Sequence, residues 1–496
     1  MTLQYDPQPL ERFPTGISGF EPVSKGGLVR GRASLVVGTS GSGKTLFCME
    51  TAFHHVEAGG KALVVAFEER PEDVVRNTMG FGWRLDERVA DGSLRFLDAT
   101  FDPDIVEQSG QFDLGGLGAM LLAEVDDLQP ELVILDSTSA ILEQYSNSPR
   151  MRYELVRLTH ELTRRGVTLL LTAERLEEYG RITRHGVEDF ISDCVVVLRQ
   201  LLEEHRVRRT VQVYKLRGGA HYNDEFPFVI GESGLSVLPL SAMRLAQGSL
   251  TDRVSVGNAK LDDMFDGGVF SNSIILVSGP TGAGKTLIGS QFAAEGCRSG
   301  ERVLYLGYEE SKPQLVQNAG AWGIDFDRWE DEGTLRILCC YPESLGWAEH
   351  LRRITREVEE FAPSRIVIDS VSSLERIATK RDFREFIVAM TSMVKSANIC
   401  TVLTSTTPRL TGGDSITDAH ISTITDAILL LRYVELDAQL RRGMLVIKMR
   451  GSQHDKNVHS YSIDSEGLHV EAPFEKIPGL ILGVPSPSRF RADEKA

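Results

Sequence analysis

Two glycine-rich segments carry the clearest chemical signal in this 496-residue sequence. The pattern GxxxxGK[ST] occurs at 38–45 and again at 279–286, each time after an apolar run and before a helical pattern. In that setting the glycines turn backbone N–H groups toward a phosphate at a helix N-terminus. The lysines are expected to reach the β- and γ-phosphates, and the final threonine hydroxyls to bind Mg²⁺. The sequence therefore predicts two sites for ATP with Mg²⁺.

The alternative is that each segment is only a glycine-rich turn between a strand and a helix, but the duplication and the correct flanks argue against it. In both loops the residues expected to hold nucleotide begin at the first glycine and run just past the lysine and threonine. They are Gly38, Gly41, Ser42, Gly43, Lys44, Thr45 and Leu46 in the first loop, and Gly279, Thr281, Gly282, Ala283, Gly284, Lys285, Thr286 and Leu287 in the second.

Hydrolysis or transfer of a phosphoryl group also needs a carboxylate near the metal and a group that takes a proton from the nucleophile. Asp136 and Asp369 end apolar runs, which is the usual place of the metal-facing acid, and each is followed by serine rather than a second acid. The proton acceptor must therefore come from elsewhere, although acidic pairs at strand ends are often only solvated. The candidates are Glu68, Glu69, Glu309 and Glu310, of which Glu309 is also expected to reach the metal.

A third repeated feature is a short segment of basic residues. Lys215, Leu216 and Arg217 are followed by His221, and the same order recurs as Lys448, Met449, Arg450 and His454. These could be surface charges. Their repetition instead favours fingers that reach a γ-phosphate, and their distance from the loops in sequence favours the phosphate of a neighbouring subunit. A site completed by its neighbour forms a head-to-tail interface that closes into a ring.

The elements that must position these residues follow from an internal repeat. Both the phosphate loops and the segments 66–77 and 307–318 are related by a shift of 241 residues, whereas the two aspartates and the two basic segments are related by a shift of 233. Each half alternates short β-branched runs with helical patterns, which predicts an α/β domain with a mostly parallel sheet flanked by helices. We expect domains at 1–245 and 246–477 and a tail at 478–496.

The composition limits the kinds of partner and the cellular location expected for this protein. There are 54 Lys and Arg against 70 Asp and Glu, a net charge of −16 that argues against a nucleic-acid backbone as the main partner. No apolar run approaches the ~20 residues of a membrane span, and the N-terminal segment lacks a signal pattern, so we expect a cytoplasmic protein. Six cysteines without a CxxC pair are expected to be reduced packing residues.

The two halves differ at one segment that is rich in hydroxyls. Residues 412–426 of the second half contain the neighbours Ser422 and Thr423, where the first half has Asp189 and Phe190. Such residues are commonly turn formers or helix caps. A role as phosphate acceptors is the other possibility, and these residues by themselves leave the choice open.

Taken together, these motifs resemble those of the KaiC family, the double-ring ATPases and autokinases of the cyanobacterial circadian clock and their homologues. The most specific strings are ITDAHISTITD at 416–426, YEES at 308–311, AWGIDF at 321–326, YPES at 341–344 and KMRGSQHDK at 448–456. The likeness runs from about Thr15 to about Pro485. It implies two tandem RecA-like P-loop domains per chain, stacked as two hexameric rings with ATP between adjacent subunits.

The resemblance also implies roles. The chain would be a serine/threonine autokinase, autophosphatase and slow ATPase in a circadian or related timing system. Ser422 and Thr423 would be autophosphorylated, with Thr417 as a nearby transient acceptor. The role of general base for the kinase would fall to Glu309, with Glu310 beside it, while Glu68 and Glu69 would serve hydrolysis. Finally, Trp322 would pack on adenine, and Lys448, Arg450 and His454 would reach the neighbour's nucleotide.

Two other functions fit the same fold. A RecA- or DnaB-like nucleic-acid motor or recombinase needs basic loops, but the candidate loops around 409–418 and 177–185 mix both charges. A nucleotide-gated scaffold without catalysis would suit a chain that lacks the acidic pairs, and this chain has both. The partner expected on family grounds is the chain itself as a homohexamer. A KaiB-type partner is left open, and a KaiA-type partner is not expected because only RADEKA follows the segment FEKIPGLILGVPSPSRF.

Overall fold

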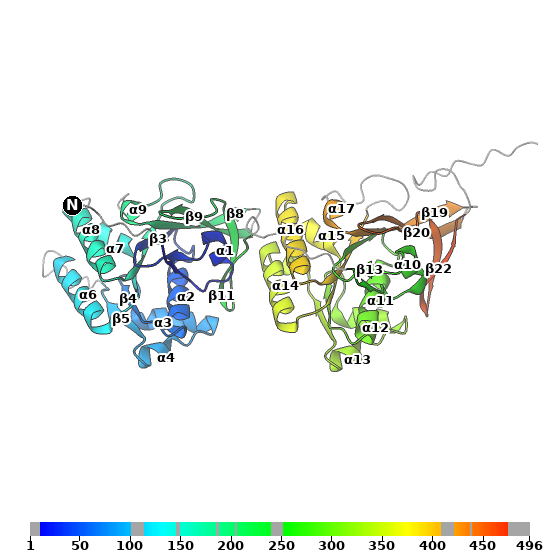
Figure 1. The fold of residues 1–496 in the computed structure, drawn as a ribbon, viewed down its shortest axis with the longest axis horizontal. Helices are drawn as coiled ribbons and strands as arrows, with labels where there is room; N and C mark the ends of the chain where they lie inside the picture. The colour runs from blue at the N-terminus through cyan, green and yellow to red at the C-terminus, as the bar shows by residue number, and fades with distance from the viewer. Residues whose placement is uncertain are drawn as a thin grey trace, which may run out of the picture. The chain divides into compact units, whose positions relative to one another are not determined.

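The computed structural model describes residues 10–100, 114–144, 149–184, 188–203, 206–239, 251–407, 421–436 and 439–474. The chain divides into two compact units, Met1–Ala242 and Met243–Ala496, and each contains a nine-stranded sheet (Figure 1). Most of the segment expected to separate the domains, and all of the expected tail, lie outside the described residues. No helix in the described ranges combines the length and the apolarity needed to cross a membrane.

Helices and strands of the first unit alternate up to β8, after which strands dominate. The strands are β1 (Arg12–Phe13), β2 (Leu28–Val29), β3 (Ala33–Gly38), β4 (Ala62–Ala66), β5 (Leu94–Asp98), β6 (Leu132–Asp136), β7 (Thr168–Glu174), β8 (Cys194–Glu203), β9 (Arg206–Leu216), β10 (Phe226–Gly231) and β11 (Gly234–Val237). The helices are α1 (Phe20–Ser24), α2 (Lys44–Glu57), α3 (Pro71–Thr78), η1 (Met79–Phe81), α4 (Leu85–Ala90), α6 (Leu114–Leu128), α7 (Thr138–Gln144), α8 (Pro149–Arg164) and α9 (Glu188–Ile191).

The second unit repeats this order. Its strands are β12 (Arg253–Val254), β13 (Val269–Phe270), β14 (Ile274–Gly279), β15 (Val303–Gly307), β16 (Leu335–Cys339), β17 (Arg365–Asp369), β18 (Cys400–Thr406), β19 (Ala427–Leu436), β20 (Gln439–Met449), β21 (His459–Asp464) and β22 (Gly467–Pro473). Its helices are α10 (Ala259–Met264), α11 (Lys285–Arg298), α12 (Lys312–Gly320), α13 (Phe326–Asp331), η3 (Pro342–Ser344), α14 (Trp347–Phe361), α15 (Val371–Ile377), α16 (Lys380–Ser396) and α17 (Ile421–Ile424).

The two sheets have the same topology. The strand order is β11-β10-β9-β8-β3-β7-β6-β4-β5 in the first and β22-β21-β20-β19-β14-β18-β17-β15-β16 in the second. In each sheet the five strands from the central phosphate-loop strand outward, together with β8 or β19, are parallel, and the last three are antiparallel. This confirms the predicted fold class of two tandem α/β domains with mostly parallel sheets.

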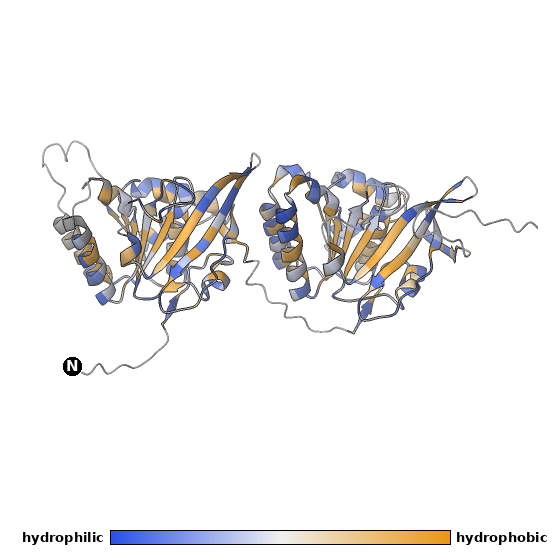
Figure 2. Ribbon diagram, turned by 90° about the horizontal axis from the view of Figure 1, so that it is seen from above, coloured by the Kyte–Doolittle hydropathy of each residue, from blue (hydrophilic) through white to orange (hydrophobic). Residues whose placement is uncertain are grey.

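Alternation along the strands explains why helices cover both faces of the first sheet. Val36 of β3 packs in one cluster with residues of α2, while its neighbours Leu35 and Val37 pack in another with residues of α6 and α8. Figure 2 shows the strands as predominantly apolar and the helices as apolar on one side and polar on the other. Burial on both faces fixes the sheet, and with it the positions of the loops at its two edges.

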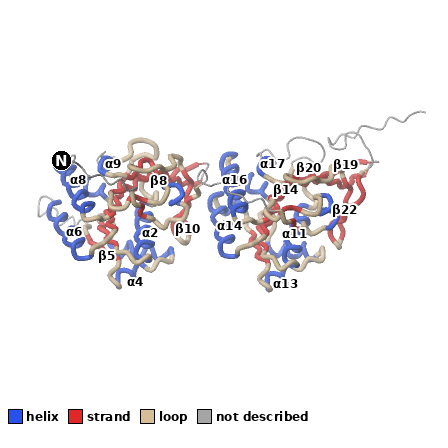
Figure 3. Tube along the Cα trace, in the orientation of Figure 1, coloured by secondary structure: helices blue, strands red, loops and turns tan. Residues whose placement is uncertain are grey.

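Loops and helices join the strands at both ends of each sheet (Figure 3), and the two ends, called edges here, carry different candidate residues. The carboxyl ends of the parallel strands meet at one edge, where Gly38 pairs in register with Glu174, and Ala66 with Asp136. The other edge begins at Ala33, whose carbonyl accepts from the Asp193 N–H at 2.8 Å, and the Asp193 carbonyl in turn accepts from the Arg217 N–H at 2.8 Å. The sheet therefore separates the phosphate-loop edge from the basic-finger edge.

Candidate nucleotide-binding sites

Each phosphate loop joins its central strand to the helix that follows it. Gly43 and Gly284 have φ values of 99° and 93° immediately before α2 and α11, a conformation that glycine adopts without strain. Lys44 Nζ donates to the Gly38 and Thr39 carbonyls at 3.1 and 3.0 Å, and Lys285 Nζ donates to the Pro280 carbonyl at 3.0 Å. Both lysines therefore fold over their own loops, with the helix N-terminus beneath them, as an anion site requires.

The metal-facing residues of the first site lie together. Thr45 Oγ1 donates to Asp136 Oδ2 at 2.7 Å, and Thr172 Oγ1 of β7 donates to Asp136 Oδ1 at 2.5 Å. Hydroxyl and carboxylate oxygens are the ligands Mg²⁺ prefers. Within the described ranges no three His, Cys, Asp or Glu side chains gather to hold a metal. The residues present thus fit an ion that takes its remaining ligands from phosphate and water.

In the second site Asp369 occupies the corresponding place. Thr404 Oγ1 and Tyr305 OH donate to its two carboxylate oxygens, the latter at 3.2 Å. Burial raises the pKa of Asp369, and hydrogen bonds from Thr404 and Thr286 act in the opposite direction. Burial also lowers the pKa of Lys285, against the pull of Asp369 and Glu309. A bound triphosphate with its metal ion would place negative charge near Lys285 and positive charge near Asp369, and so would compensate the charges of these two buried groups.

The first glutamate of each acidic pair accepts a hydrogen bond from the serine that directly follows Asp136 or Asp369 in the sequence. Ser137 Oγ donates to Glu68 Oε1, whereas in the second unit Ser370 Oγ and Ser373 Oγ donate to Glu309 Oε1 at 2.7 and 2.9 Å. Burial raises the pKa of Glu68, and the bond from Ser137 opposes this. The Glu309 side chain is 40% exposed, so it remains open to a reacting group. These two carboxylates have the position of a proton acceptor.

The second glutamate of each pair is held elsewhere. Asn318 Nδ2 of α12 donates to Glu310 Oε2 at 3.0 Å, and Asn77 Nδ2 of α3 donates to Glu69 Oε2 at 3.3 Å. Burial also raises the pKa of Glu310, although the Asn318 hydrogen bond opposes it. The two members of each pair therefore have different partners, because Glu69 and Glu310 are bonded to the helix that follows.

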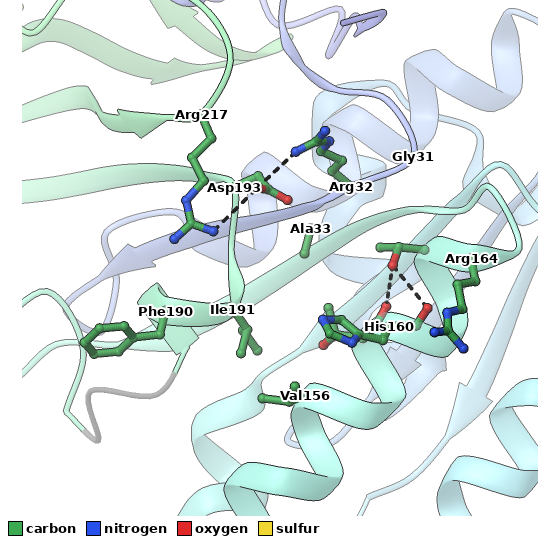
Figure 4. Close-up of a pocket in the computed structure, with 12 residues that line it drawn as sticks. Gly31, Arg32, Ala33, Val156, His160, Arg164, Phe190, Ile191, Asp193 and Arg217 are labelled. Atoms are coloured by element: carbon green, nitrogen blue, oxygen red, sulfur yellow. Dashed lines mark hydrogen bonds and ion pairs between the residues drawn. The ribbon is translucent and has the colours of Figure 1, made fainter. Parts of the chain in front are cut away.

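The basic fingers of the first unit lie at the opposite sheet edge. Lys215 Nζ donates to the Asp189 and Ser192 carbonyls, both at 2.7 Å, and burial together with the charge of Arg217 lowers its pKa. Arg217 lies 3.6 Å from Asp193 and lines a pocket of about 570 Å³ bounded by α8, α9 and the start of β3 (Figure 4). The half-exposed Arg217 side chain can be approached from outside this chain.

In the second unit the basic fingers, Lys448 and Arg450, are hydrogen-bonded to the backbone of the segment that contains Thr423. Lys448 Nζ donates to the Thr425 carbonyl at 2.7 Å, and Arg450 Nη2 donates to the Thr423 carbonyl. Thr423 lies in α17 with an exposed side chain, and Ser422 belongs to the same helix. Thr417 lies outside the described residues. The backbone of the segment at Thr423 and Thr425 and the fingers therefore lie together at the edge remote from this unit's own phosphate loop.

Strand length sets the separation between the two edges. The six-residue strands β3 and β14 start at the finger edge and end at the phosphate loops. At about 3.3 Å per residue they span roughly 17 Å. Neither the fingers nor the hydroxyl pair can then reach the phosphate loop of their own unit.

The remaining predicted residues are distributed as follows. Trp322 is partly buried against the second core, and the Leu46 side chain is partly buried against the first. The side chains of Leu216, Leu287 and Met449 are core residues, so only their backbone could meet a nucleotide. His221 and His454 follow the fingers, and within the described chain His221 has no hydrogen-bond partner on either ring nitrogen. All six cysteines are free, and four of them are buried.

Sequence reasoning did not identify several residues that complete the sites. The serines beside each glutamate and the threonines on β7 and β18 bond to the acidic groups, and Glu178 binds Thr39 of the first loop at 2.6 Å. Repetition of serine directly after both aspartates was a usable signal. Glu178 carried none, because its loop mixes charges and lies 139 residues from Thr39 in sequence.

Comparison with known proteins agrees with this geometry. The family model described as "ATPase: KaiC" matches twice, at residues 13–242 and 254–475. The chain is 45% identical over 478 residues to circadian clock protein KaiC3 of Synechocystis, covering 96% of this chain and 95% of that protein. It is 46% identical over 489 residues to the circadian clock oscillator protein KaiC of Rippkaea orientalis, covering 98% and 94%. Two phosphate-loop domains with repeated acids and fingers, matched over nearly the whole length, make this chain a member of the KaiC family of circadian clock ATPases.

Proposed function

We propose that this protein is a Mg-ATP-dependent serine/threonine autokinase, autophosphatase and slow ATPase that works as a homohexameric double ring in a timing system. The first unit would hydrolyse ATP, and the second would transfer phosphate to Ser422 and Thr423. The relatives named as circadian clock oscillator proteins support the timing role.

The observation that carries the proposal is the paired arrangement of Glu309 and Asp369. Glu309 is held by Ser370, the residue next to Asp369, and Asp369 lies beside Thr286 at the start of α11. A bound Mg²⁺ would neutralise charge on the phosphates. Glu309 would then accept the proton of an attacking hydroxyl, and Lys285 would meet the charge on the phosphates. In the first unit Glu68 has the same place beside Ser137, where it would orient water.

The position of the hydroxyl pair supports transfer between subunits. Ser422 and Thr423 belong to the finger edge, about one strand length from the phosphate loop of their own unit. A head-to-tail ring would bring the finger edge of one chain to the phosphate edge of the next. Lys448 and Arg450 would then contact the neighbour's nucleotide from the same edge that offers the hydroxyls.

Incubation with γ-labelled ATP and Mg²⁺, followed by phosphopeptide mass spectrometry, tests this proposal. We expect label on Ser422, Thr423 or both, and its loss in the double variant Ser422→Ala/Thr423→Ala. The double variant should still hydrolyse ATP in its first unit, which controls for folding. Label found only at other positions would reject the assignment of the acceptors.

A further inference from the structure

A loop that follows β7 is hydrogen-bonded to the first phosphate loop, and this contact is called the brace. We name residues 175–184 the strap. Thr39 Oγ1, on the second residue of the phosphate loop, donates to Glu178 Oε1 at 2.6 Å, and the Gln200 N–H of β8 donates to Glu178 Oε2 at 3.1 Å. Both carboxylate oxygens are therefore used, one on the phosphate loop and one on the sheet. Charged hydrogen bonds of this kind are among the stronger ones in proteins.

The strap is itself held by two buried arginines. Arg175 is 4% exposed and donates through Nε and Nη2 to the Arg181 and Gly180 carbonyls, both at 3.1 Å. Arg199 is 5% exposed, and its Nε donates to the Glu178 carbonyl at 3.1 Å. Buried guanidinium groups that bind backbone carbonyls fix the course of a loop, so the Glu178 carboxylate is presented on a rigid support.

The far side of the strap is also secured. The Arg199 guanidinium lies 5.0 Å from the centre of the Tyr179 ring, and Arg199 Nη1 lies 3.2 Å from Glu225 Oε1. Tyr179 OH donates to Glu225 Oε2 at 3.2 Å. These contacts link the strap to Arg199 of β8 and to Glu225, which directly precedes β10.

The strap also connects to the catalytic side of the site. The Glu174 N–H, at the end of β7, donates to Ser139 Oγ at 2.8 Å, and the Arg175 N–H donates to the Gly38 carbonyl at 3.1 Å. Ser139 lies in α7, two residues after the serine that binds Glu68. One short segment thus contacts both the helix behind the proton acceptor and the phosphate loop.

The second unit cannot make the same contact through its phosphate loop. The residue that corresponds to Thr39 is Pro280, which has no hydroxyl. The backbone contact is nevertheless repeated, since the Thr407 N–H donates to the Gly279 carbonyl at 3.1 Å. The side-chain brace therefore distinguishes the proposed hydrolytic site from the proposed kinase site.

We propose that Glu178 is a positioning residue of the first ATP site, which through Thr39 holds the phosphate loop in the geometry needed for hydrolysis. The inference rests on the ATPase activity proposed for the first unit. Glu178 would act through Thr39 rather than on the nucleotide directly, because its two carboxylate oxygens already accept from Thr39 and Gln200. Small displacements of a positioned phosphate reduce the rate of its chemistry more than its binding. Loss of the brace should therefore lower kcat while leaving KM for ATP nearly unchanged.

The test uses the full chain with the second site silenced by Lys285→Met. In this background we expect Thr39→Val and Glu178→Gln each to lower kcat for ATP hydrolysis by about 5- to 10-fold, with KM changed less than about 2-fold. Glutamine cannot replace Glu178 because both carboxylate oxygens accept hydrogen bonds and the amide keeps only one acceptor. Thr39→Ser keeps the hydroxyl and should keep the rate. Glu177→Gln makes the same chemical change on the adjacent exposed residue and should have no effect.

A double variant separates a shared contact from two unrelated defects. Thr39→Val/Glu178→Gln should hydrolyse ATP no more slowly than the worse single variant, because both changes remove one interaction. Unchanged kcat in the single variants, or multiplicative losses in the double variant, would overturn the inference. An equal loss in Thr39→Ser would also overturn it, because the hydroxyl would then not be the cause.

Hydrogen exchange measured with ATP bound tests the brace independently of hydrolysis. Peptides spanning 39–43 should exchange faster in Thr39→Val and in Glu178→Gln than in Thr39→Ser, at unchanged melting temperature. A background chain that hydrolyses no ATP would refute the proposed ATPase activity. In that case the exchange result alone would decide the brace, and equal exchange in all variants would reject it.

Discussion

At the scale of single residues, the two members of each acidic pair have different surroundings. Glu309 is bound by serine hydroxyls beside Asp369, whereas Glu310 is bound by Asn318 of the next helix. A hydroxyl-bound, partly exposed carboxylate can accept a proton, and a carboxylate fixed to a helix serves mainly to orient that helix.

The first prediction follows from this difference. Glu309→Gln should reduce autophosphorylation by about 10²- to 10⁴-fold, because glutamine cannot act as the general base. ATP hydrolysis by the first unit should remain, and Glu68→Gln should give the reciprocal pattern. Incorporation of labelled phosphate and release of inorganic phosphate measure the two activities separately.

Glu310→Gln serves as the matched control, because glutamine keeps an oxygen for Asn318. It should change autophosphorylation by less than about 3-fold. Equal loss of phosphorylation and hydrolysis in Glu309→Gln would contradict the division of labour between the units.

A second residue-scale feature concerns stability. Arg365, 2% exposed, binds Glu301 through Nε at 2.9 Å and Nη2 at 2.7 Å. Burial by itself would raise the pKa of Glu301, but the hydrogen bond and charge of Arg365 outweigh it and lower that pKa. Because the folded pKa is lowered, this stabilisation is present above the ordinary pKa of glutamate and is lost as pH falls through the folded value.

We expect Glu301→Gln to destabilise the second unit by about 2 kcal/mol at pH 7, since it leaves the buried Arg365 charge without a charged partner. The difference from the unaltered chain should shrink as pH falls through the lowered folded pKa of Glu301, below which this carboxyl is protonated in both the folded and the unfolded chain. Urea unfolding at pH 7 and at a series of lower pH values measures the difference. Glu295→Gln, which loses only a surface pair with Arg298, should cost less than about 0.5 kcal/mol, and an equal cost would contradict the explanation.

At the scale of elements, α16 is connected to the segment that carries the hydroxyl pair. Lys395, buried near the end of α16, forms an ion pair with Asp426 and donates to the Asn272 carbonyl at 2.8 Å. Asp426 directly precedes β19 and follows α17, and its Oδ2 also accepts the Ile274 N–H at 2.8 Å. The ion pair therefore fixes the position of α17 relative to the central strand.

Lys395→Met should remove this connection. We expect a loss of about 3 kcal/mol in the stability of the second unit, because Asp426 would keep a largely buried charge without its partner. Autophosphorylation should fall as α17 loses its fixed position. Urea unfolding and phosphate incorporation measure the two effects.

The exposed Lys380 at the start of the same helix provides the comparison. Lys380→Met should leave both quantities within about 0.5 kcal/mol and 2-fold of the unaltered chain. If the Lys395→Met and Lys380→Met variants unfold at the same urea concentration, the Lys395–Asp426 ion pair does not hold α17 in place.

At the scale of the whole molecule, the sheet of each unit separates what a reaction must bring together. Phosphate loops and acids occupy the carboxyl edge, and fingers and hydroxyls occupy the other edge. A single chain therefore has two incomplete half-sites per unit. In the proposed function a second copy would complete each site, and this separation is the physical reason for proposing a ring.

Mixing two defective chains tests this prediction. One carries Glu309→Gln and cannot catalyse transfer, and the other carries Ser422→Ala/Thr423→Ala and cannot accept phosphate. We expect each alone to remain unlabelled at 422–423, and the mixture with ATP to place label on the Glu309→Gln chain. Affinity tags of different mass on the two variants show which chain carries the labelled phosphate.

Gel filtration accompanies the mixing experiment. With ATP present, the unaltered chain should elute at the size of a hexamer. Absence of label in a mixture that forms mixed hexamers would show that transfer occurs within one chain.

Much of this was available from the sequence. The duplicated phosphate loops, the strand-ending Asp136 and Asp369 and the basic segments predicted two α/β domains of one topology, because strand and helix periodicities and a strict motif leave few alternatives.

The residue pattern alone did not distinguish Glu309 from Glu310, and only the family resemblance favoured Glu309. The pattern also gave no sign of the Thr39–Glu178 contact, because the partners of a side chain depend on which loops the folded sheet brings together. Nor could it place the fingers opposite their own phosphate loop. The amino-acid order determined the units and their chemical inventory, since these depend on local pattern. Which acid lies beside the strand-ending aspartate, and at which edge of the sheet the basic segments lie, was decided only by the strand order and register of the sheet.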